Sequence, residues 1–144
     1  MKFVDVNVLI YAINRNAVQH HRVRRWWEDA LNGDEPVGLA WIVVLGFLRL
    51  STNARILEKV LTPALAIEQL EEWLAHPITR IVAEPEQHWS SLKNVLFQTG
   101  AFGNRTTEAH LAAMAIHYNA TLVSCDTDFA RFKRLRWENP AAVE

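Results

Sequence analysis

The chain has 144 residues, of which 50% are hydrophobic and 22% are charged. That length suits one domain, and the mixture of apolar residues with both charge signs excludes a disordered or fibrous chain. With 15 basic against 16 acidic residues the formal net charge is −1, which excludes a protein that coats nucleic acid through a general basic excess, so any nucleic-acid site must be a local patch.

The single cysteine, Cys125, excludes an intramolecular disulfide and a cysteine-rich zinc site, and it favours a reducing compartment. The longest apolar stretch runs from Val37 to Leu48, is too short to span a bilayer and contains two glycines. Lys2 follows Met1 directly, without the apolar core of a targeting leader. We therefore expect residues 1–144 to form one cytoplasmic domain with no membrane partner.

Strand and helix patterns alternate along the chain. The short apolar segment from Lys2 to Val6 predicts a buried strand, and 8–14 predicts a buried helix after it. Thr62 and Pro63 are typical of the cap and the first position of a helix. The same reasoning predicts further strands at 37–39, 80–83, 121–124 and around Trp137, and helices at 20–31, 41–52, 63–74, 86–97 and 106–118, the last of them capped by Thr106 or Thr107.

Strands that alternate with helices through short loops are typical of a parallel sheet covered on both faces. We therefore predict an α/β fold, a three-layer α/β/α sandwich with a central, mostly parallel sheet. Trp41 and Trp73 are expected in its core. In such sheets ligands bind beyond the carboxyl ends of the strands, near the point where the strand order reverses. The residues that follow the strands are therefore the first candidates for a functional site.

Acidic residues follow two of the predicted strands. Asp5 lies at the end of the first strand, and Asp126 and Asp128 follow the strand at 121–124, while Glu108 lies in the first turn of the preceding helix. Parallel topology brings these carboxylates to one edge of the sheet, where their mutual repulsion favours a bound divalent cation. Oxygen ligands favour Mg²⁺ or Mn²⁺ over Zn²⁺. Such a cation supports hydrolysis of a phosphodiester bond by activated water.

Each of these acids also has a purely structural interpretation. Asp5 can cap the helix that follows it, and Glu108 suits the positive end of a helix dipole. Asp126 and Asp128 can form an ordinary capped turn. Only their joint placement at one sheet edge points to chemistry, and that placement depends on the predicted topology.

Four segments, in this order, resemble a known family: VDVNVLIYA, GFLRLSTNARI, GNRTTEAHLAAMA and TLVSCDTDFARF. Together they resemble a PIN domain, and more narrowly the VapC toxins of toxin–antitoxin pairs. The resemblance extends from Lys2 to Pro140. It implies a PIN-like α/β/α sandwich and a Mg²⁺-dependent (or Mn²⁺-dependent) endoribonuclease that is inhibited by a cognate VapB-type antitoxin.

The resemblance also implies roles for individual residues. Asp5 matches the first acid of the family, Asp126 the acid after the late strand, and Asp128 the second acid of that turn. Glu108 stands where the family most often has Asp. We therefore expect Asp5, Glu108 and Asp126 to hold the metal and Asp128 to complete the catalytic set. Gly46 occupies the position of a further family acid, so a tightly held second metal is not expected.

Basic residues outside these motifs are candidates for contacts with RNA. The resemblance favours tRNA or rRNA as substrate and a homodimer as the assembly. A second basic cluster at 131–136 either draws RNA toward the acids or is solvated surface. The predicted RNA-binding residues are Arg22, Arg25, Arg49 and Arg55.

Two other functions fit parts of the sequence. A catalytically weakened PIN-like module would bind RNA or antitoxin without cleavage, because Gly46 and Glu108 depart from the family pattern. A receiver-type or phosphate-transfer domain also has acids at strand ends, but it needs a Lys at the end of a later strand, and no predicted strand ends in one.

Overall fold

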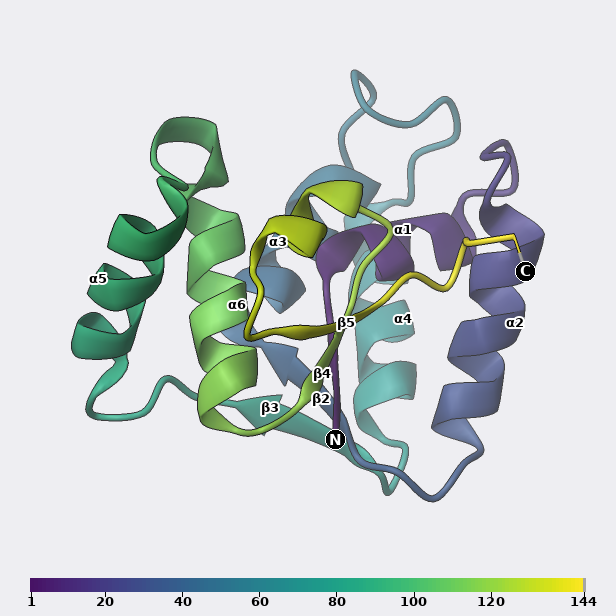
Figure 1. Cartoon of the computed structure of the whole chain (residues 1–144). Coiled ribbons are helices and arrows are strands. Elements are labelled where there is room, and N and C mark those ends of the chain that lie inside the picture. Colours follow the sequence, from purple (N-terminus) through teal and green to yellow (C-terminus); the bar gives the residue numbers. More distant parts are fainter. Residues whose placement is uncertain (144) are drawn as a thin grey trace.

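A single parallel sheet organises the molecule, which we describe from a computed structural model over residues 1–143 (Figure 1). The strand order is β3-β2-β1-β4-β5, and every neighbouring pair is parallel. All carboxyl ends therefore lie at one edge, and the order reverses beside β1, the central strand. The strands are β1 (Lys2–Val4), β2 (Val37–Ala40), β3 (Thr79–Val82), β4 (Thr121–Val123) and β5 (Arg136–Glu138).

The helices form a layer on each face of the sheet, as a right-handed path through this strand order requires. Helices α1 to α4 pack against one another in one layer, and α5 packs against α6 in the other (Figure 1). The helices are α1 (Val6–Ile13), α2 (His20–Leu31), α3 (Trp41–Ser51), α4 (Pro63–Leu74), α5 (His88–Thr99) and α6 (Thr106–His117), with short 3₁₀ turns η1 (Gly103–Arg105) and η2 (Thr127–Arg131). The predicted three-layer sandwich is confirmed.

Aromatic side chains join the first helical layer. The rings of Trp27 and Phe47 each meet Trp73 edge to face, with centroids 5.5 and 5.1 Å apart. Trp73 is buried as predicted, but the prediction for Trp41 is wrong, because 54% of it is exposed. Trp41 is the first residue of α3 and shares its outer side with Leu45, while Phe47 faces the core.

Most predicted elements are confirmed to within two residues, and the differences arise at helix ends. Helix α1 begins at Val6 instead of Val8, because Asp5 accepts a hydrogen bond from the Val6 amide. The predicted threonine cap of α6 is wrong: η1 leads straight into that helix, and the Thr106 hydroxyl donates to the Gly103 carbonyl at 2.9 Å. Within residues 1–143, no helix combines the length and apolar character needed to cross a membrane.

Candidate functional site

The pairing of β1 with β4 positions the first acid. Val4 lies opposite Val123, so the residues that follow, Asp5 and Ser124, leave the sheet side by side. The Asp5 amide continues the ladder by donating to the Val123 carbonyl at 2.9 Å. The chain then turns into α1, and the Asp5 side chain is held at the carboxyl edge of the sheet.

The Asp5 carboxylate is buried and hydrogen-bonded on both oxygens. Oδ1 accepts from the Val6 amide at 2.7 Å, and Oδ2 accepts from the Ser124 hydroxyl at 2.8 Å and from Asn7 Nδ2 at 3.3 Å. Burial raises the pKa of Asp5, and the charge of Asp126 raises it further, while the hydrogen bonds from Ser124 and Val6 oppose the rise. Asp5 is thus a structural cap and a charged neighbour of Asp126 at the same time.

Ser124 and Asn7 connect Asp5 to the turn that carries the other acids. The Ser124 hydroxyl oxygen accepts from Asn7 Nδ2 at 3.0 Å and from the Asp126 amide at 3.1 Å. Asn7 Oδ1 accepts from the Cys125 amide at 3.0 Å. These bonds fix the backbone of the turn relative to β1, so the position of Asp126 depends on residues near both ends of the chain.

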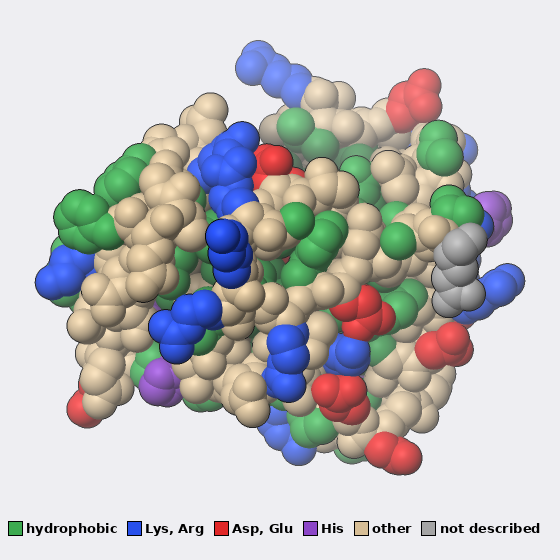
Figure 2. Space-filling view, viewed as in Figure 1, with side chains coloured by type: hydrophobic (Ala, Val, Ile, Leu, Met, Phe, Trp, Pro, Cys, Tyr) green, Lys and Arg blue, Asp and Glu red, His purple; other side chains and the backbone are tan. Residues whose placement is uncertain are grey.

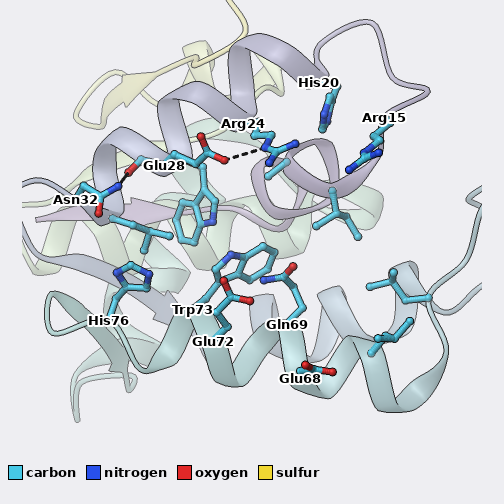
Figure 3. Close-up of a pocket in the computed structure, with 16 residues that line it drawn as sticks. Arg15, His20, Arg24, Glu28, Asn32, Glu68, Gln69, Glu72, Trp73 and His76 are labelled. Carbon is cyan, nitrogen blue, oxygen red and sulfur yellow. Dashed lines mark hydrogen bonds and ion pairs between the residues drawn. The ribbon is translucent and has the colours of Figure 1, made fainter.

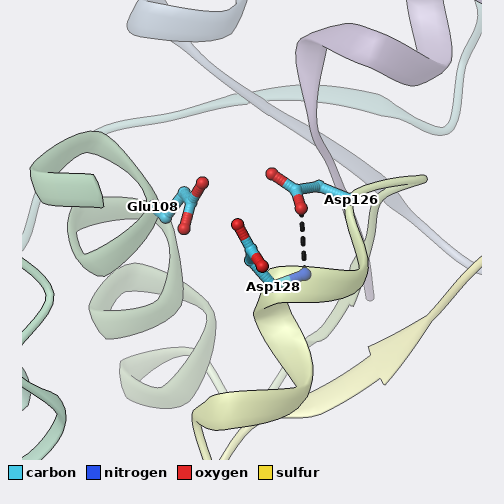
Figure 4. Close-up of side chains that lie close together, drawn as sticks. All are labelled: Glu108, Asp126 and Asp128. Carbon is cyan, nitrogen blue, oxygen red and sulfur yellow. Dashed lines mark hydrogen bonds between the residues drawn. The ribbon is translucent and has the colours of Figure 1, made fainter. Parts of the chain in front are cut away.

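Three carboxylates meet beyond β4. Glu108, from the first turn of α6, faces Asp126, which caps η2, and Asp128 within η2, and one oxygen from each lies within 4.8 Å of the others (Figure 4). Asp126 Oδ1 also accepts from the Asp128 amide at 2.9 Å, which closes the turn. Helix α6 runs antiparallel to β4, so its amino end returns to the edge where β4 ends. Of the four carboxylates expected to converge at this edge, these three lie together.

Glu108 is the most perturbed member of this cluster. Its pKa is raised to about 7, first by burial, then by a side-chain hydrogen bond with Asp126 and by the charges of Asp126 and Asp128, with Arg105 opposing the rise. Its Oε2 atom is buried and has no hydrogen-bond partner among the described residues. A buried carboxylate oxygen without a partner is costly, and a cation would relieve that cost.

The chemistry of these donors fits a hard divalent cation. The cluster offers only carboxylate oxygens, which suit Mg²⁺, Mn²⁺ or Ca²⁺ better than Zn²⁺. The predicted metal ligands are Asp5, Glu108 and Asp126, whereas the group whose oxygens lie within 4.8 Å of one another contains Asp128 in place of Asp5. Asp5 instead supports the turn through Ser124.

Gly46 stands at a close contact between two helices. A Cβ atom at this position would lie 3.2 Å from Cγ2 of Val6, so α3 meets α1 closely and a side chain here would require Val6 to shift by a few tenths of an ångström. A side chain at position 46 would therefore press on the first residue of α1.

The predicted RNA-binding arginines come from two separate elements of the first helical layer and from the loop that follows one of them. Arg22 and Arg25 lie on α2, whereas Arg49 ends α3 and Arg55 follows it in the loop. Helix α1 packs against both α2 and α3 and so separates the two pairs. Arg22 also donates to the Ala142 carbonyl at 3.1 Å.

Sequence reasoning missed Arg105, the cation nearest to the acids. Its Nη2 atom lies 3.8 Å from Asp128 Oδ2, and both side chains are partly exposed. Arg105 ends η1 three residues before Glu108, so its spacing from the acidic first turn of α6 was the available signal.

A separate cavity of about 510 Å³ lies between α2 and α4 (Figure 3). Trp27 and Trp73 form its wall, and Arg24 pairs with Glu28 at 2.8 Å beside them. None of the four predicted acids lines it. This cavity is therefore a second candidate binding surface, distinct from the acidic cluster.

Comparison with known proteins identifies the family. Residues 2–135 match the family model described as PIN domain. The chain is 40% identical to Ribonuclease VapC37 of Mycobacterium tuberculosis over 143 residues, covering 99% of each chain. It is 39% identical over 136 residues to Ribonuclease VapC33 of the same species, covering 94% of this chain and 95% of that one. The fold resembles VapBC2 of Rickettsia felis, solved bound to a DNA fragment from its promoter, with a TM-score of 0.71 at 20% identity, covering 96% of this chain and 97% of that one. The chain therefore belongs to the PIN-domain family and, within it, to the VapC ribonucleases.

Proposed function

We propose that this chain is the toxin of a toxin–antitoxin pair and that it cleaves RNA as a Mg²⁺-dependent endoribonuclease, with Mn²⁺ as an alternative ion. The observation that carries the proposal is the meeting of Glu108, Asp126 and Asp128, with a buried and unpaired oxygen on Glu108. Residues 1–144 act as one PIN-like domain. An RNA substrate and a single unpaired cysteine favour the cytoplasm as its compartment.

Each residue around the acidic cluster has a proposed role that follows from its position. Asp126 and Asp128 hold their carboxylates in a fixed turn, and Glu108 faces them from α6. A divalent cation bound there would polarise water and offset the negative charge that develops on the phosphate. Asp5 keeps the turn in place through Ser124 and adds negative charge beside Asp126. Arg105, at the rim, is placed to attract the phosphate of an approaching RNA.

The cavity between α2 and α4 is the surface we assign to a cognate VapB-type antitoxin. Its aromatic wall and its rim of both charge signs suit an amphipathic segment laid into a groove (Figure 3). The VapBC structure of Rickettsia felis supports a partner of this class.

We assign the outer side of α3 to a homodimer contact. Trp41, Ile42 and Leu45 are 54%, 38% and 60% exposed there and form an apolar surface on one helix.

An isosteric variant tests the catalytic role of the cluster. Asp126→Asn keeps the oxygen that accepts from the Asp128 amide but removes the charge. We expect cleavage of purified tRNA and rRNA by antitoxin-free protein to fall by about 100-fold or more, because the cluster loses a ligand. Wild-type protein in EDTA should behave in the same way. The measurement is the rate of appearance of discrete RNA fragments.

Glu71→Gln, an exposed acid on α4, is the matched control and should cleave at the wild-type rate. Cleavage that persists in EDTA, or in Asp126→Asn at the control rate, would contradict the assignment. RNA binding without cleavage at any concentration of divalent ion would instead support the inactive RNA-binding module.

A further inference from the structure

A basic segment follows the acidic turn directly. Residues 131–136 read RFKRLR and carry four cations in six positions, in a chain whose net charge is −1. Lys and Arg side chains gather on the face of the molecule around η2 and β5 (Figure 2). Of the four cations, Arg136 already has a hydrogen-bond partner, because it donates to the Asn119 carbonyl. The other three are Arg131, Lys133 and Arg134.

These three cations line a groove between α5, α6 and the segment after η2. The groove has a volume of about 340 Å³. Its opposite wall comes from α5 and carries amides and hydroxyls, and its floor is apolar. The polar residues of that wall are Ser91, Asn94, Gln98 and Thr99. A hollow of about 310 Å³ shares Arg134 and Ile116 with it and continues the groove along α6.

The side chains of Arg131, Lys133 and Arg134 form no ion pair with residues 1–143. The carboxylates of residues 1–143 that form ion pairs do so with the amino terminus, Lys2, Arg24, Arg105 and His110. Arg131 Nε is buried and donates to no described atom. A buried guanidinium nitrogen without an acceptor points to an acceptor supplied by a ligand.

The groove begins beside the acidic cluster. Asp128 and Arg131 lie in the same short turn, η2, three residues apart. At a 3₁₀ rise of about 2 Å per residue, this separation is roughly 6 Å along the axis. A nucleic-acid strand whose phosphate lies at the carboxylates would therefore bring its next phosphates to the groove.

We propose that the groove formed by Arg131, Lys133, Arg134 and the facing side of α5 binds phosphates and sugars of the RNA strand that flanks the cleaved bond. The proposal rests on the proposed function for the identity of the strand. Most protein contacts to a nucleic-acid backbone come from Arg and Lys together with Ser, Thr, Asn and Gln, and side chains of these kinds supply the polar part of the groove. The hydroxyls and amides of α5 suit the ribose 2′-hydroxyl.

Neutralising two exposed cations of the groove tests this proposal. We compare K133Q/R134Q with a control, K59Q/K93Q, which changes the net charge equally at two exposed lysines outside the groove. Binding of labelled single-stranded RNAs of about 4 and about 16 nucleotides is measured by fluorescence anisotropy in EDTA, over a series of salt concentrations. Both variants keep buried residues intact, so each should fold.

For the longer RNA we expect K133Q/R134Q to weaken binding by about 5-fold or more and to reduce the slope of log affinity against log salt by about 1.4, or about 0.7 for each phosphate that is no longer neutralised. The shorter RNA and the control should change by less than about 2-fold. In cleavage assays with long RNA, KM should rise and kcat should stay unchanged.

Equal losses of affinity in the variant and the control would overturn the proposal. An RNA affinity of K133Q/R134Q equal to that of the wild type would also overturn it. If this variant at the same time bound poly-glutamate more weakly than the wild type, the groove would be assigned to an acidic protein segment. If the wild type cleaves RNA but all three proteins bind RNA equally well, the proposed function is supported and the role of the groove is contradicted. RNA binding that depends on the groove but is never followed by cleavage supports the groove and contradicts the nuclease.

Discussion

At the scale of single residues, Glu108 determines how the cluster responds to protons. Its pKa of about 7 lies well above the ordinary value of 4.5, so the neutral form is favoured in the folded chain. Protonation of Glu108 therefore stabilises the folded chain. This contribution to the free energy of unfolding is complete below the pKa of Glu108 in the unfolded chain, about 4.5, and it is lost as the pH rises to about 7. A cation requires the ionised form, so protons and metal compete for Glu108.

This competition predicts a pH-dependent metal affinity. Between about pH 6 and pH 7 the affinity for Mn²⁺ should rise by about 5-fold, as the ionised fraction of Glu108 increases, and it should level off above the pKa of Glu108. Calorimetric titration of antitoxin-free protein measures it. Glu108→Gln should bind Mn²⁺ more weakly and should lack this rise. An affinity that is flat across this range in the wild type would mean that Glu108 is not a ligand.

At the scale of elements, α1 and α3 are in close contact beside the residue that precedes α1, Asp5. Gly46 allows α3 to approach Val6 at the first position of α1, directly after Asp5. A larger side chain at position 46 would push α1, and with it the backbone that holds Asp5, away from α3.

Gly46→Val should therefore destabilise the fold by about 1–3 kcal/mol, which lowers Tm by roughly 3–10 °C. Thermal unfolding in EDTA measures the change without any contribution from metal. Val6→Ala removes the Cγ2 atom that a side chain at position 46 would meet, so the double variant should lose less than the sum of the two single variants. Strict additivity would show that this contact is not the cause.

How well the sequence predicts an element depends on whether its apolar residues have a clear period and its ends a clear boundary. The periodic helices at 20–31 and 63–74 match the structure residue by residue, because each has a clear apolar face and a clear boundary. Trp41 was misplaced because apolar character does not show which side of a short apolar helix faces the core. The start of α1 was misplaced because its first turn, like the strand before it, is apolar.

For the site, the three acids that meet could be predicted, since parallel topology alone brings the ends of β4 and α6 together. The sequence does not predict that Asp128 joins this cluster while Asp5 lies outside it and supports the turn. This arrangement depends on the Ser124 hydroxyl, which bonds to Asp5 and to the Asp126 amide, and spacing contains no signal for such a bond. Arg105 and the unpaired Arg131 nitrogen likewise depend on side-chain directions.

At the scale of the whole molecule, the repulsion among the acids should reduce the stability of the metal-free protein. Burial of Asp5 and Glu108 raises both pKa values, so at neutral pH their ionisation opposes folding. A cation that binds only the folded chain should reverse this effect.

At a metal concentration of about 100 times Kd, the gain is about 2.7 kcal/mol, which raises Tm by roughly 5–10 °C. Thermal unfolding with Mn²⁺, with Mg²⁺ and with EDTA provides the comparison. Asp126→Asn should unfold at nearly the same temperature with and without metal. A wild-type Tm that ignores both ions would contradict a metal centre in this cluster.

The central position of β1 also has a consequence for the timing of toxicity. Asp5 and Ser124 are 119 residues apart in the chain and adjacent in the sheet, and Asp126 and Asp128 come later still. A ribosome adds about 5–20 residues per second, so several seconds of translation separate the first acid from the last. Throughout that interval the nascent chain lacks the complete acidic cluster. If this cluster is the catalytic centre, as proposed, translation delivers the enzyme in an inert form, and we expect activity to begin only when the late strand has emerged and paired with β1.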